Sequence, residues 1–341
     1  MAIPDKPRLI ITQGDPAGVG PEIIVKALAQ KRVRRAIRPL VLGDARVLAR
    51  ALKICSVKLR LCEVTSPAAA WQAPASALAV MNPYPSVQNV KPGHWTQHTG
   101  MASLAAVYLG AELAIKQQGD ALVTAPICKA AWHAAGADVP GHTELLAKLT
   151  GAKNFAMMFV GGPFRLVLAT IHEPLARVPA LLTAARIVQT TAAAVRELQG
   201  RFGIQRPLVA VAALNPHAGE GGLLGDEEKR VIAPAIKQLR RRGMQAEGPF
   251  VPDTFFAEAL KGRWDLLVCM YHDQGLIPFK LLALYAGVNV TAGLPIIRTS
   301  PDHGTAFDLA GTGRADAGSM TAALLTAADM VRHQQRISRK K

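Results

Sequence analysis

The stretch RLIITQGDPAGVGPEIIVKALAQ, residues 8–30, contains the structural unit from which the fold is predicted. Residues 8–12 are an apolar run of strand length. A loop of small and polar residues follows, and residues 21–30 have the apolar spacing of a helix with Pro21 in its first turn. Where strand, loop and helix recur in this order, the strands pair in parallel and helices cover both faces of the sheet. The stretch therefore predicts an α/β protein.

The same order of elements recurs along the chain. Further strands are predicted at residues 39–42, 121–124, 165–170, 208–213, 265–270 and 288–291, and further helices at 100–118, 183–199, 227–242 and 253–260. Residues 66–98 are the exception, because five prolines interrupt the helical pattern and predict an extended or looped segment. The 341 residues suffice for two domains or for one large α/β unit with two cores.

The composition excludes several classes of protein. Half of the residues are hydrophobic and only 19% are charged, which excludes a disordered or low-complexity chain. The longest apolar runs, 156–164 and 281–288, are too short to cross a bilayer, so no membrane partner is expected. The first residues lack a cleavage pattern and predict a cytoplasmic protein. Four scattered cysteines indicate neither a disulfide framework nor a thiolate metal site.

The chain is strongly basic, with 40 Lys and Arg against 24 Asp and Glu, a net charge of +16. Basic residues cluster at 31–38, 240–242 and 332–341. A nucleic-acid-binding module would interleave such clusters with aromatic residues and bind DNA in a steeply salt-dependent way, but only 5% of the chain is aromatic. We therefore expect no nucleic-acid partner. The clusters are interpreted as solvated surfaces whose field attracts small anionic ligands.

Three predicted strands end close to a histidine. His172, His217 and His272 follow the strands at 165–170, 208–213 and 265–270. The carboxyl ends of parallel strands lie at one edge of a sheet, where α/β proteins bind their ligands. Three neutral imidazoles suit a divalent metal ion and leave a position open for an oxygen ligand. The alternative is that each histidine only hydrogen-bonds within its own loop, and spacing alone does not decide between the two.

Other residue groups suit an anionic substrate. In PGHTE (140–144), His142 and Thr143 lie at a predicted helix start, where they would donate to phosphate oxygens, although Thr143 as a simple N-cap is the alternative. Lys280, Asn289 and Arg298 follow His272 and together fit the capture of carboxylate or phosphate, although each alone is typical of a surface.

Two glycine-rich loops separate a strand from a helix. These loops, residues 14–22 and 219–228, match neither the dinucleotide-binding nor the P-loop pattern. Residues 14–18 are therefore interpreted as a tight turn.

Several longer motifs point to a known family. GDPAGVGPE, VTAP, GHTE, ATIHEPL, LNPHAGEGG, YHDQGL and GVNVTAGLPIIRTSPDHGTAFDLAG occur in the order seen in 4-hydroxythreonine-4-phosphate dehydrogenases of vitamin B6 biosynthesis, which the chain resembles from Thr12 to about Asp329. The resemblance implies two αβα lobes with largely parallel sheets, like isocitrate and isopropylmalate dehydrogenases. It also implies an active site in the cleft between the lobes and a homodimer whose subunits share that site. We expect residues 1–130 with about 290–341 to form the nucleotide-side lobe, and about 131–289 the lobe for metal, substrate and dimer contacts.

The resemblance also implies roles for single residues. The metal ligands match His172, His217 and His272, and the substrate-binding residues match His142, Thr143, Lys280, Asn289 and Arg298. The segment DHGTAFDLAGTGRAD (302–316) is similar to the nucleotide-binding loop of the decarboxylating dehydrogenases, which makes His303, Gly304, Ala306 and Asp308 candidates for the cofactor site. Cys128 departs from the family pattern, in which Asn or His is common, and the basic tail is not shared.

The implied reaction is the NAD- or NADP-linked oxidation of 4-(phosphooxy)-L-threonine, followed by decarboxylation. A divalent ion (Zn, Mg or Co) would lower the pKa of the substrate hydroxyl. Lys280 would hold the substrate or carry a proton, and Asp253 and Asp273 would orient metal-binding imidazoles, although Asp253 as a helix N-cap is the alternative. Two other functions remain open: a dehydrogenase of threonate or erythronate 4-phosphate, and a metal-dependent hydrolase.

Overall fold

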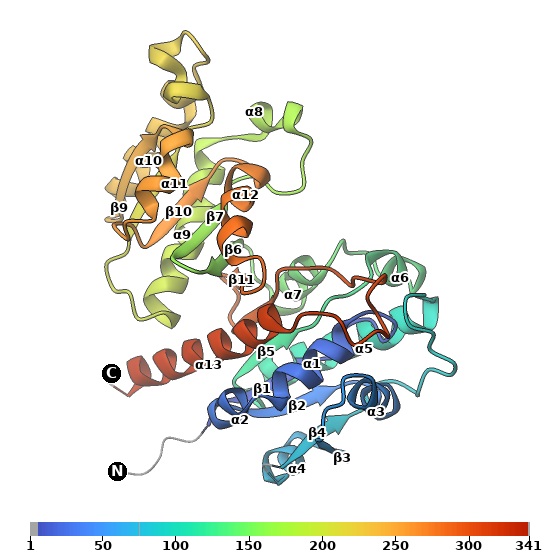
Figure 1. Cartoon of the computed structure of the whole chain (residues 1–341). Helices are drawn as coiled ribbons and strands as arrows, with labels where there is room; N and C mark the ends of the chain where they lie inside the picture. Colours follow the sequence, from blue (N-terminus) through green and yellow to red (C-terminus); the bar gives the residue numbers. More distant parts are fainter. Residues whose placement is uncertain (1–5, 75, 340–341) are drawn as a thin grey trace. The chain divides into compact units, whose positions relative to one another are not determined.

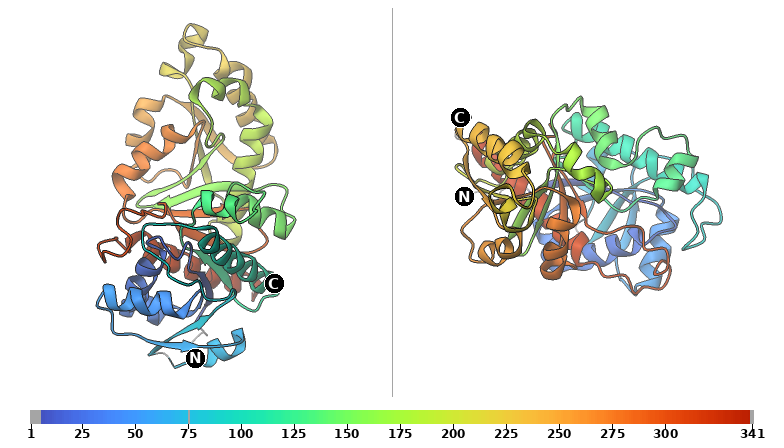
Figure 2. Two further views of the ribbon diagram at one scale, coloured as in Figure 1. Left: turned by 90° about the vertical axis from the view of Figure 1, so that its right-hand side faces the viewer. Right: turned by 90° about the horizontal axis from the view of Figure 1, so that it is seen from above.

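The computed structural model describes residues 6–74 and 76–339 (Figure 1). The chain divides into two compact units. Unit 1 comprises Met1–Ala152 and Leu294–Arg332, and unit 2 comprises Lys153–Gly293 and His333–Lys341. Each unit contains six strands with helices on both faces, α5 opposite α1 and α3 in unit 1, and α9 opposite α12 in unit 2 (Figure 2). The prediction of an α/β fold with two αβα lobes is confirmed.

The sheet of unit 1 has the order β3-β4-β2-β1-β5-β12, and all its neighbouring strands are parallel. Its strands are β1 (Arg8–Thr12), β2 (Arg38–Leu42), β3 (Arg60–Glu63), β4 (Ala77–Met81), β5 (Ala121–Thr124) and β12 (Arg298–Pro301). The central strand β1 pairs with β2 and β5, so its apolar side chains are fully buried. This burial explains why β1 has a continuous apolar run and no alternation.

The helices of unit 1 include four that begin at a side-chain N-cap. The helices of this unit are α1 (Gly20–Ala29), α2 (Lys31–Ala36), α3 (Ala45–Ile54), α4 (Pro67–Gln72), α5 (Gln97–Ile115), α6 (Lys129–Ala134), α7 (His142–Thr150) and α13 (Gly318–Ser338), whose residues 333–338 belong to unit 2. The Asp44 carboxylate accepts the Arg46 N–H at the start of α3, and Thr96 and Thr99 form a reciprocal capping box on α5. Gly110 lets α5 lie close to the sheet, because a Cβ there would be 2.8 Å from Leu122 Cδ1.

The sheet of unit 2 has the order β11-β6-β7-β10-β8-β9. Its strands are β6 (Ala156–Gly161), β7 (Phe164–Leu168), β8 (Leu208–Ala212), β9 (Gln245–Phe250), β10 (Leu266–Cys269) and β11 (Val288–Ala292). Strand β6 is antiparallel to both β7 and β11, whereas β7, β10, β8 and β9 are parallel. The sheet is therefore largely, not wholly, parallel.

The longer helices of unit 2 are α9 (Ala184–Arg201), α10 (Ala233–Arg241), α11 (Pro252–Ala259) and α12 (His272–Ala283), and α8 (Val178–Leu181) is a single turn. A buried cluster containing Phe159, Phe255 and Phe279 lies between the strands and the helices α11 and α12. These aromatic rings anchor α12, which begins at a candidate metal ligand.

One local prediction was wrong, and two of the alternatives are excluded. Residues 66–98 contain α4 and β4, because a proline in the first helical turn is compatible with a helix and Ser66 accepts the Ala69 N–H as its N-cap. Thr143 is not an N-cap, since α7 starts at His142 after Gly141. Asp253 is not an N-cap either, because it lies inside the first turn of α11, which follows Val251.

The boundaries of the compact units lie elsewhere than the predicted lobe boundaries at about 131 and 290. The chain passes from unit 1 to unit 2 between residues 152 and 153 and returns between residues 293 and 294. The first boundary lies after α7 because α6 and α7 pack against α5 in unit 1. The residues from His333 onward belong to unit 2, where Gly203 lies against the His333 ring.

Across residues 6–74 and 76–339, no single helix is long and apolar enough to cross a membrane. One pair of helical segments, Leu175–Leu181 with Ala184–Arg201, has together the length and the apolar composition of a membrane span, but the two segments are bent by 93° relative to each other.

Candidate active site

The three candidate metal ligands follow three adjacent strands of unit 2. Strand β10 pairs in parallel with β7 on one side and with β8 on the other. His172 follows β7, His272 follows β10 and His217 follows β8, so all three lie beyond the carboxyl ends of neighbouring strands. This topology places the three imidazoles at one edge of one sheet, the edge at which α/β proteins bind ligands.

The structure brings two of these histidines together. The backbone ladder continues past the strands, because Thr170 donates its N–H to the Met270 carbonyl at 3.1 Å. The rings of His172 and His272 consequently lie with their centroids 5.6 Å apart. The Asp273 carboxylate lies 2.7 Å from Nδ1 of His272, where it fixes the ring and leaves Nε2 as the second nitrogen for a ligand.

His217 lies exposed on the loop after β8. Within the part of the chain that the structure describes, no three His, Cys, Asp or Glu side chains are close enough together to hold a metal ion. The donor types and the shared edge fit a divalent ion, for which His172 and His272 would be two of the ligands.

A buried amide that sequence reasoning missed links the loops bearing these histidines. Gln274 accepts the Met270 N–H at 2.6 Å and donates to the Ala213 carbonyl at 2.7 Å. Ala213 directly follows β8, so Gln274 ties the end of β8 to the end of β10. Its position in the motif YHDQGL, two residues after the histidine, was the available signal.

The loop that carries His217 has an unusual backbone. Residues 217–221 all have positive φ, between 42° and 80°, and three of them are not glycine. His172 also has a positive φ of 50°. Non-glycine residues in this region cost conformational energy and occur preferentially at functional sites. The strain therefore supports a functional role for both histidines.

Glu228 holds the start of this loop. Its buried carboxylate accepts the N–H groups of Leu214 and Asn215, each at 2.8 Å, and the Asn215 side-chain amide at 3.0 Å. Burial raises the pKa of Glu228, but these hydrogen bonds outweigh burial and hold the pKa below its usual value. Glu228 is a second residue that the sequence analysis missed.

Two other predicted carboxylates differ in position. Asp273 touches a candidate metal ligand, as described above, whereas Asp253 is exposed in the first turn of α11.

The predicted anion-binding residues of unit 1 form a compact group. Arg298, at the start of β12 and only 3% exposed, donates through Nε and Nη2 to the Thr124 hydroxyl at the end of β5. The His142 ring contacts the Trp132 ring edge-to-face. Burial and the nearby Arg298 charge lower the pKa of His142 well below its usual value, so the imidazole is neutral at physiological pH.

Two polar atoms among the predicted substrate residues are buried without a hydrogen-bond partner in the described structure. They are Nε2 of His142 in unit 1 and Oδ1 of Asn289 in unit 2. Lys280 is half-buried in α12, two turns after His272, and Thr143 is buried next to His142 in α7. A buried polar atom without a partner costs stability, so these two atoms are candidates for hydrogen bonds to a ligand.

The candidate cofactor residues lie on the open segment between β12 and α13. His303, Gly304 and Asp308 are exposed, and Ala306 has a φ of 40°. A Cβ on Gly304 would meet nothing within 4 Å, so neither packing nor a positive φ requires glycine there. The backbone at Gly304 is therefore open enough for a ligand to approach it closely.

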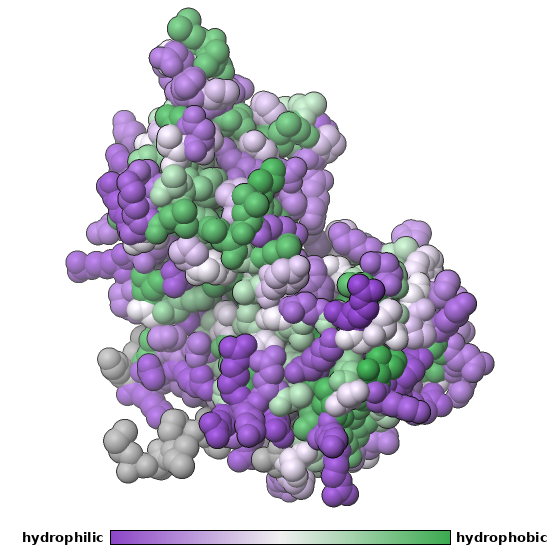
Figure 3. All heavy atoms as spheres, in the orientation of Figure 1, coloured by the Kyte–Doolittle hydropathy of each residue, from purple (hydrophilic) through white to green (hydrophobic). Residues whose placement is uncertain are grey.

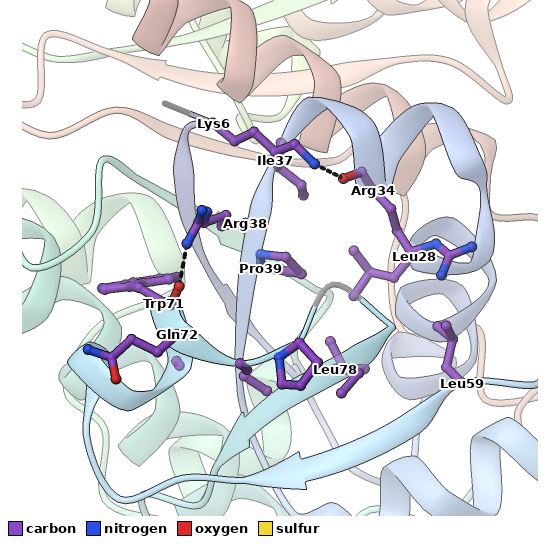
Figure 4. A pocket seen from close by; sticks show the side chains of 15 residues that line it. Lys6, Leu28, Arg34, Ile37, Arg38, Pro39, Leu59, Trp71, Gln72 and Leu78 are labelled. Carbon is purple, nitrogen blue, oxygen red and sulfur yellow. Dashed lines mark hydrogen bonds between the residues drawn. The ribbon is translucent and has the colours of Figure 1, made fainter. Parts of the chain in front are cut away.

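A cavity of about 470 Å³ lies elsewhere in unit 1 (Figure 4). Arg38, Trp71 and Leu78 are among its lining residues. Arg38 begins β2 and Leu78 is near the start of β4, so the cavity is at the amino ends of the strands. It is therefore distinct from the ligand-binding edge.

Comparison with known proteins gives consistent matches over almost the whole chain. The model of the family described as pyridoxal phosphate biosynthetic protein PdxA matches residues 35–327. The chain is 49% identical over 329 residues to a 4-hydroxythreonine-4-phosphate dehydrogenase of Geobacter metallireducens, with 96% of each chain covered. It is 42% identical to a D-threonate 4-phosphate dehydrogenase of Salmonella typhimurium, with 92% of this chain and 96% of the relative covered.

Solved structures of similar proteins agree with these sequence matches. A 4-hydroxythreonine-4-phosphate dehydrogenase of Klebsiella pneumoniae superposes with a TM-score of 0.86 at 41% identity, covering 96% of this chain and 98% of the other. A terephthalate 1,2-cis-dihydrodiol dehydrogenase of Burkholderia xenovorans superposes with a TM-score of 0.64 at 32% identity, covering 95% and 98%.

Proposed function

The chain belongs to the PdxA family of pyridoxal phosphate biosynthetic proteins, and on this premise we propose that it oxidises 4-(phosphooxy)-L-threonine with NAD or NADP. The product, 2-amino-3-oxo-4-(phosphooxy)butanoate, then loses carbon dioxide to give 3-amino-2-oxopropyl phosphate. The observation that carries the proposal is the pair of buried, partnerless atoms, His142 Nε2 and Asn289 Oδ1, on residues that a polar substrate would satisfy.

Arg298 and His142 have complementary roles in binding the substrate. Burial lowers the pKa of Arg298 only to about 10, so its guanidinium remains charged and offers a fork to phosphate or carboxylate. The neutral His142 adds a hydrogen bond without adding a second charge. Both groups are held before the substrate arrives, which reduces the cost of ordering them.

The donor set at the edge of unit 2 fits a divalent metal ion, which we assign to His172, His217 and His272. When bound, Zn, Mg or Co would lower the pKa of the substrate hydroxyl and stabilise negative charge on the oxidised product. Asp273 fixes the ring of His272, and Asp253 is the more distant carboxylate proposed for the same task. Lys280 holds the substrate and accepts or returns the proton during the reaction.

We assign the nicotinamide dinucleotide to the segment with His303, Gly304, Ala306 and Asp308. The open space at Gly304 and the exposure of its neighbours support this assignment.

We propose a homodimer with a shared active site, located in the cytoplasm. The support is a row of exposed apolar residues on α12 and just after it, where Ile277, Leu281 and Tyr285 recur every four residues. Figure 3 shows hydrophobic atoms gathered over α12. An exposed apolar row on a helix is typical of a protein interface, and this helix starts at His272. No nucleic-acid or membrane partner is proposed.

A second candidate substrate is D-threonate 4-phosphate, on which the Salmonella relative acts by name. It carries a hydroxyl where 4-(phosphooxy)-L-threonine carries an amine. A phosphate site built from Arg298 and His142 would accept either compound.

The proposal is tested by following nicotinamide reduction with 4-(phosphooxy)-L-threonine, D-threonate 4-phosphate and D-erythronate 4-phosphate, each with NAD or NADP. We expect the first substrate to give the highest kcat/KM. Phosphate release without nicotinamide reduction would instead indicate a hydrolase and overturn the proposal.

The metal assignment is tested with the same assay after chelation and after re-addition of each ion. His217→Ala should abolish metal-dependent turnover, whereas the exposed control His98→Ala should retain it. Near-normal turnover of His217→Ala without metal would contradict the assignment. Lys280→Gln should lower kcat by about 100-fold, the scale of lost acid–base catalysis.

A further inference from the structure

The glycine-rich stretch 14–22 matches no phosphate-binding pattern, and the structure shows its contacts instead. The stretch and the helix α1 that it opens pack against the segment 302–316. Val19 donates its N–H to the Thr305 carbonyl at 3.0 Å. A Cβ on Gly18 would lie 3.1 Å from Thr305, so a small residue there permits the close approach.

A buried carboxylate on α1 makes the strongest of these contacts. Glu22 is 3% exposed, and its two oxygens accept the N–H groups of Gly311 at 2.5 Å and of Gly313 at 2.8 Å. Both glycines have positive φ, 83° and 70°. The carboxylate thus selects one conformation of a backbone that glycine would otherwise leave free, and hydrogen bonds to a charged group are the stronger kind.

Lys26 completes the arrangement from the next turn of the same helix. Its ammonium donates to the carbonyls of Gly313 at 2.5 Å and Ala315 at 2.7 Å. Residues four apart lie on one face of a helix, so a carboxylate and an ammonium on α1 bind N–H and C=O groups of alternate residues, 311, 313 and 315, in one segment. Gly313 is held from both sides, through its N–H and its C=O.

We propose that Glu22 and Lys26 are positioning residues that hold the segment 302–316 in its dinucleotide-binding conformation before the dinucleotide arrives. This inference rests on the proposed function, in which His303, Gly304, Ala306 and Asp308 contact the cofactor. His303, Gly304 and Asp308 of that segment are exposed, whereas its backbone at Gly311 and Gly313 is fixed by a residue almost 300 positions earlier in the chain. Such a segment presents its outer surface to a ligand at little ordering cost.

Replacing Glu22 or Lys26 is expected to weaken the binding of the dinucleotide specifically. Without Glu22 or Lys26, the segment must be ordered when NAD or NADP binds, so dinucleotide affinity should fall by about 10- to 30-fold. The kcat at saturating dinucleotide and the KM for the phosphorylated substrate should stay within about twofold, because neither residue contacts the assigned substrate groups.

The test compares Glu22→Gln and Lys26→Met with the wild type in the full-length protein. Calorimetric titration with NAD and with NADP gives the dinucleotide Kd, steady-state kinetics separates the two KM values, and amide exchange reports on residues 302–316. Glu112→Gln is the matched control, because Glu112, like Glu22, lies four residues before a lysine, and it pairs with that lysine, Lys116, on an exposed face of α5. Lys26→Arg keeps the donors and should restore most of the affinity.

Faster exchange in 302–316 with a selectively raised dinucleotide Kd would support the proposal. An unchanged dinucleotide Kd in Lys26→Met, or an equal loss of all kinetic parameters, would overturn the proposal. If Glu22→Gln fails to fold, the result for Lys26→Met alone tests it. If the wild type itself binds neither dinucleotide, the proposed function fails; if the wild type binds and the variants bind equally well, only this inference fails.

Discussion

His142 and Arg298 show how burial acts in opposite ways on two neighbouring cationic groups. Burial and the Arg298 charge push the imidazole to its neutral form, while the guanidinium, with its pKa lowered to about 10 and supported by Glu144, keeps its charge at neutral pH. The pair therefore presents one charge and one neutral polar group to a ligand. An anionic substrate would be attracted by Arg298 without requiring His142 to take up a proton.

We expect the protein to lose stability as the pH falls below 6.5, the usual pKa of histidine. Because folding lowers the pKa of His142, the unfolded chain binds a proton that the folded protein does not, which favours unfolding in acid. While the folded imidazole stays neutral, each further pH unit lowers the free energy of unfolding by about 1.4 kcal/mol. Urea unfolding from about pH 7 to pH 5 should show this slope in the wild type and a smaller slope in His142→Gln. The exposed control His133→Gln should keep the wild-type slope, and equal slopes in all three proteins would refute the prediction.

Arg298→Lys should raise the KM for the phosphorylated substrate by about 10- to 100-fold, the loss expected when a charged, forked hydrogen-bond donor is replaced by a single ammonium. The kcat should change little, since Arg298 is assigned to binding in both ground and transition states. Steady-state kinetics with saturating dinucleotide measures both values. Arg332→Lys, which alters an exposed ion pair with Asp329, should leave the KM unchanged. A large fall in kcat in Arg298→Lys would show that the residue acts in the chemical step.

Among the secondary-structure elements, the short turn after β8 is the most strained. Five consecutive residues, 217–221, have left-handed backbone, which glycine adopts freely and other residues adopt at a cost. The hydrogen bonds of Glu228 and the closure of the loop stabilise this conformation. The strained backbone therefore lies directly at His217, the assigned metal ligand, whose imidazole must be ordered to bind an ion.

Ala218→Gly should raise the free energy of unfolding by about 0.5–1 kcal/mol, because glycine removes the strain of a φ of 53°. Ala218→Val should lower it by more than about 1 kcal/mol, since a branched side chain is worse in this region. The control is Ala257→Gly in α11, a right-handed helical site, where glycine should destabilise by about 1 kcal/mol. Denaturant unfolding measures all three. If Ala218→Gly and Ala257→Gly both lower the free energy of unfolding, the turn is not strained in solution.

Strand ends were predictable from the sequence, but the contacts between loops were not. The apolar runs before His172, His217 and His272 fix where each strand ends, and the rule for parallel strands then places the histidines at one edge. No local pattern reveals that Gln274 bridges β8 and β10, or that Glu22 binds Gly311, because these partners are about 60 and 290 positions apart. The error at Pro67 had a different cause: the proline was treated as a helix breaker, although it occupies the first turn.

At the scale of the whole molecule, the excess of cations and the exposed apolar row have separate consequences. The net charge of +16 raises the local concentration of anionic substrates around the protein. The row on α12, in which Leu281 is 82% exposed, is the surface that we assign to a second copy of the chain. Leu281→Glu should therefore shift the protein from dimer to monomer in sedimentation analysis, whereas Ile115→Glu, on α5 of unit 1, should not.

A shared site makes a further prediction about mixed dimers. If a shared site takes one imidazole from the second copy, we expect His217 to be the exchanged ligand, because the rings of His172 and His272 lie together within one chain. In a dimer of His172→Ala with His217→Ala, one of the two sites would then have all three imidazoles intact. Because half of the randomly refolded dimers are mixed, activity should return to about a quarter of the wild-type value. The control mixture, His172→Ala with His272→Ala, should stay inactive, because those residues come from the same chain and every site lacks one of them. Recovery in the control mixture with none in the first would show that the sites exchange His272 instead of His217. Absence of recovery in both, with mixed dimers verified by mass spectrometry, would show that each chain builds its metal site alone.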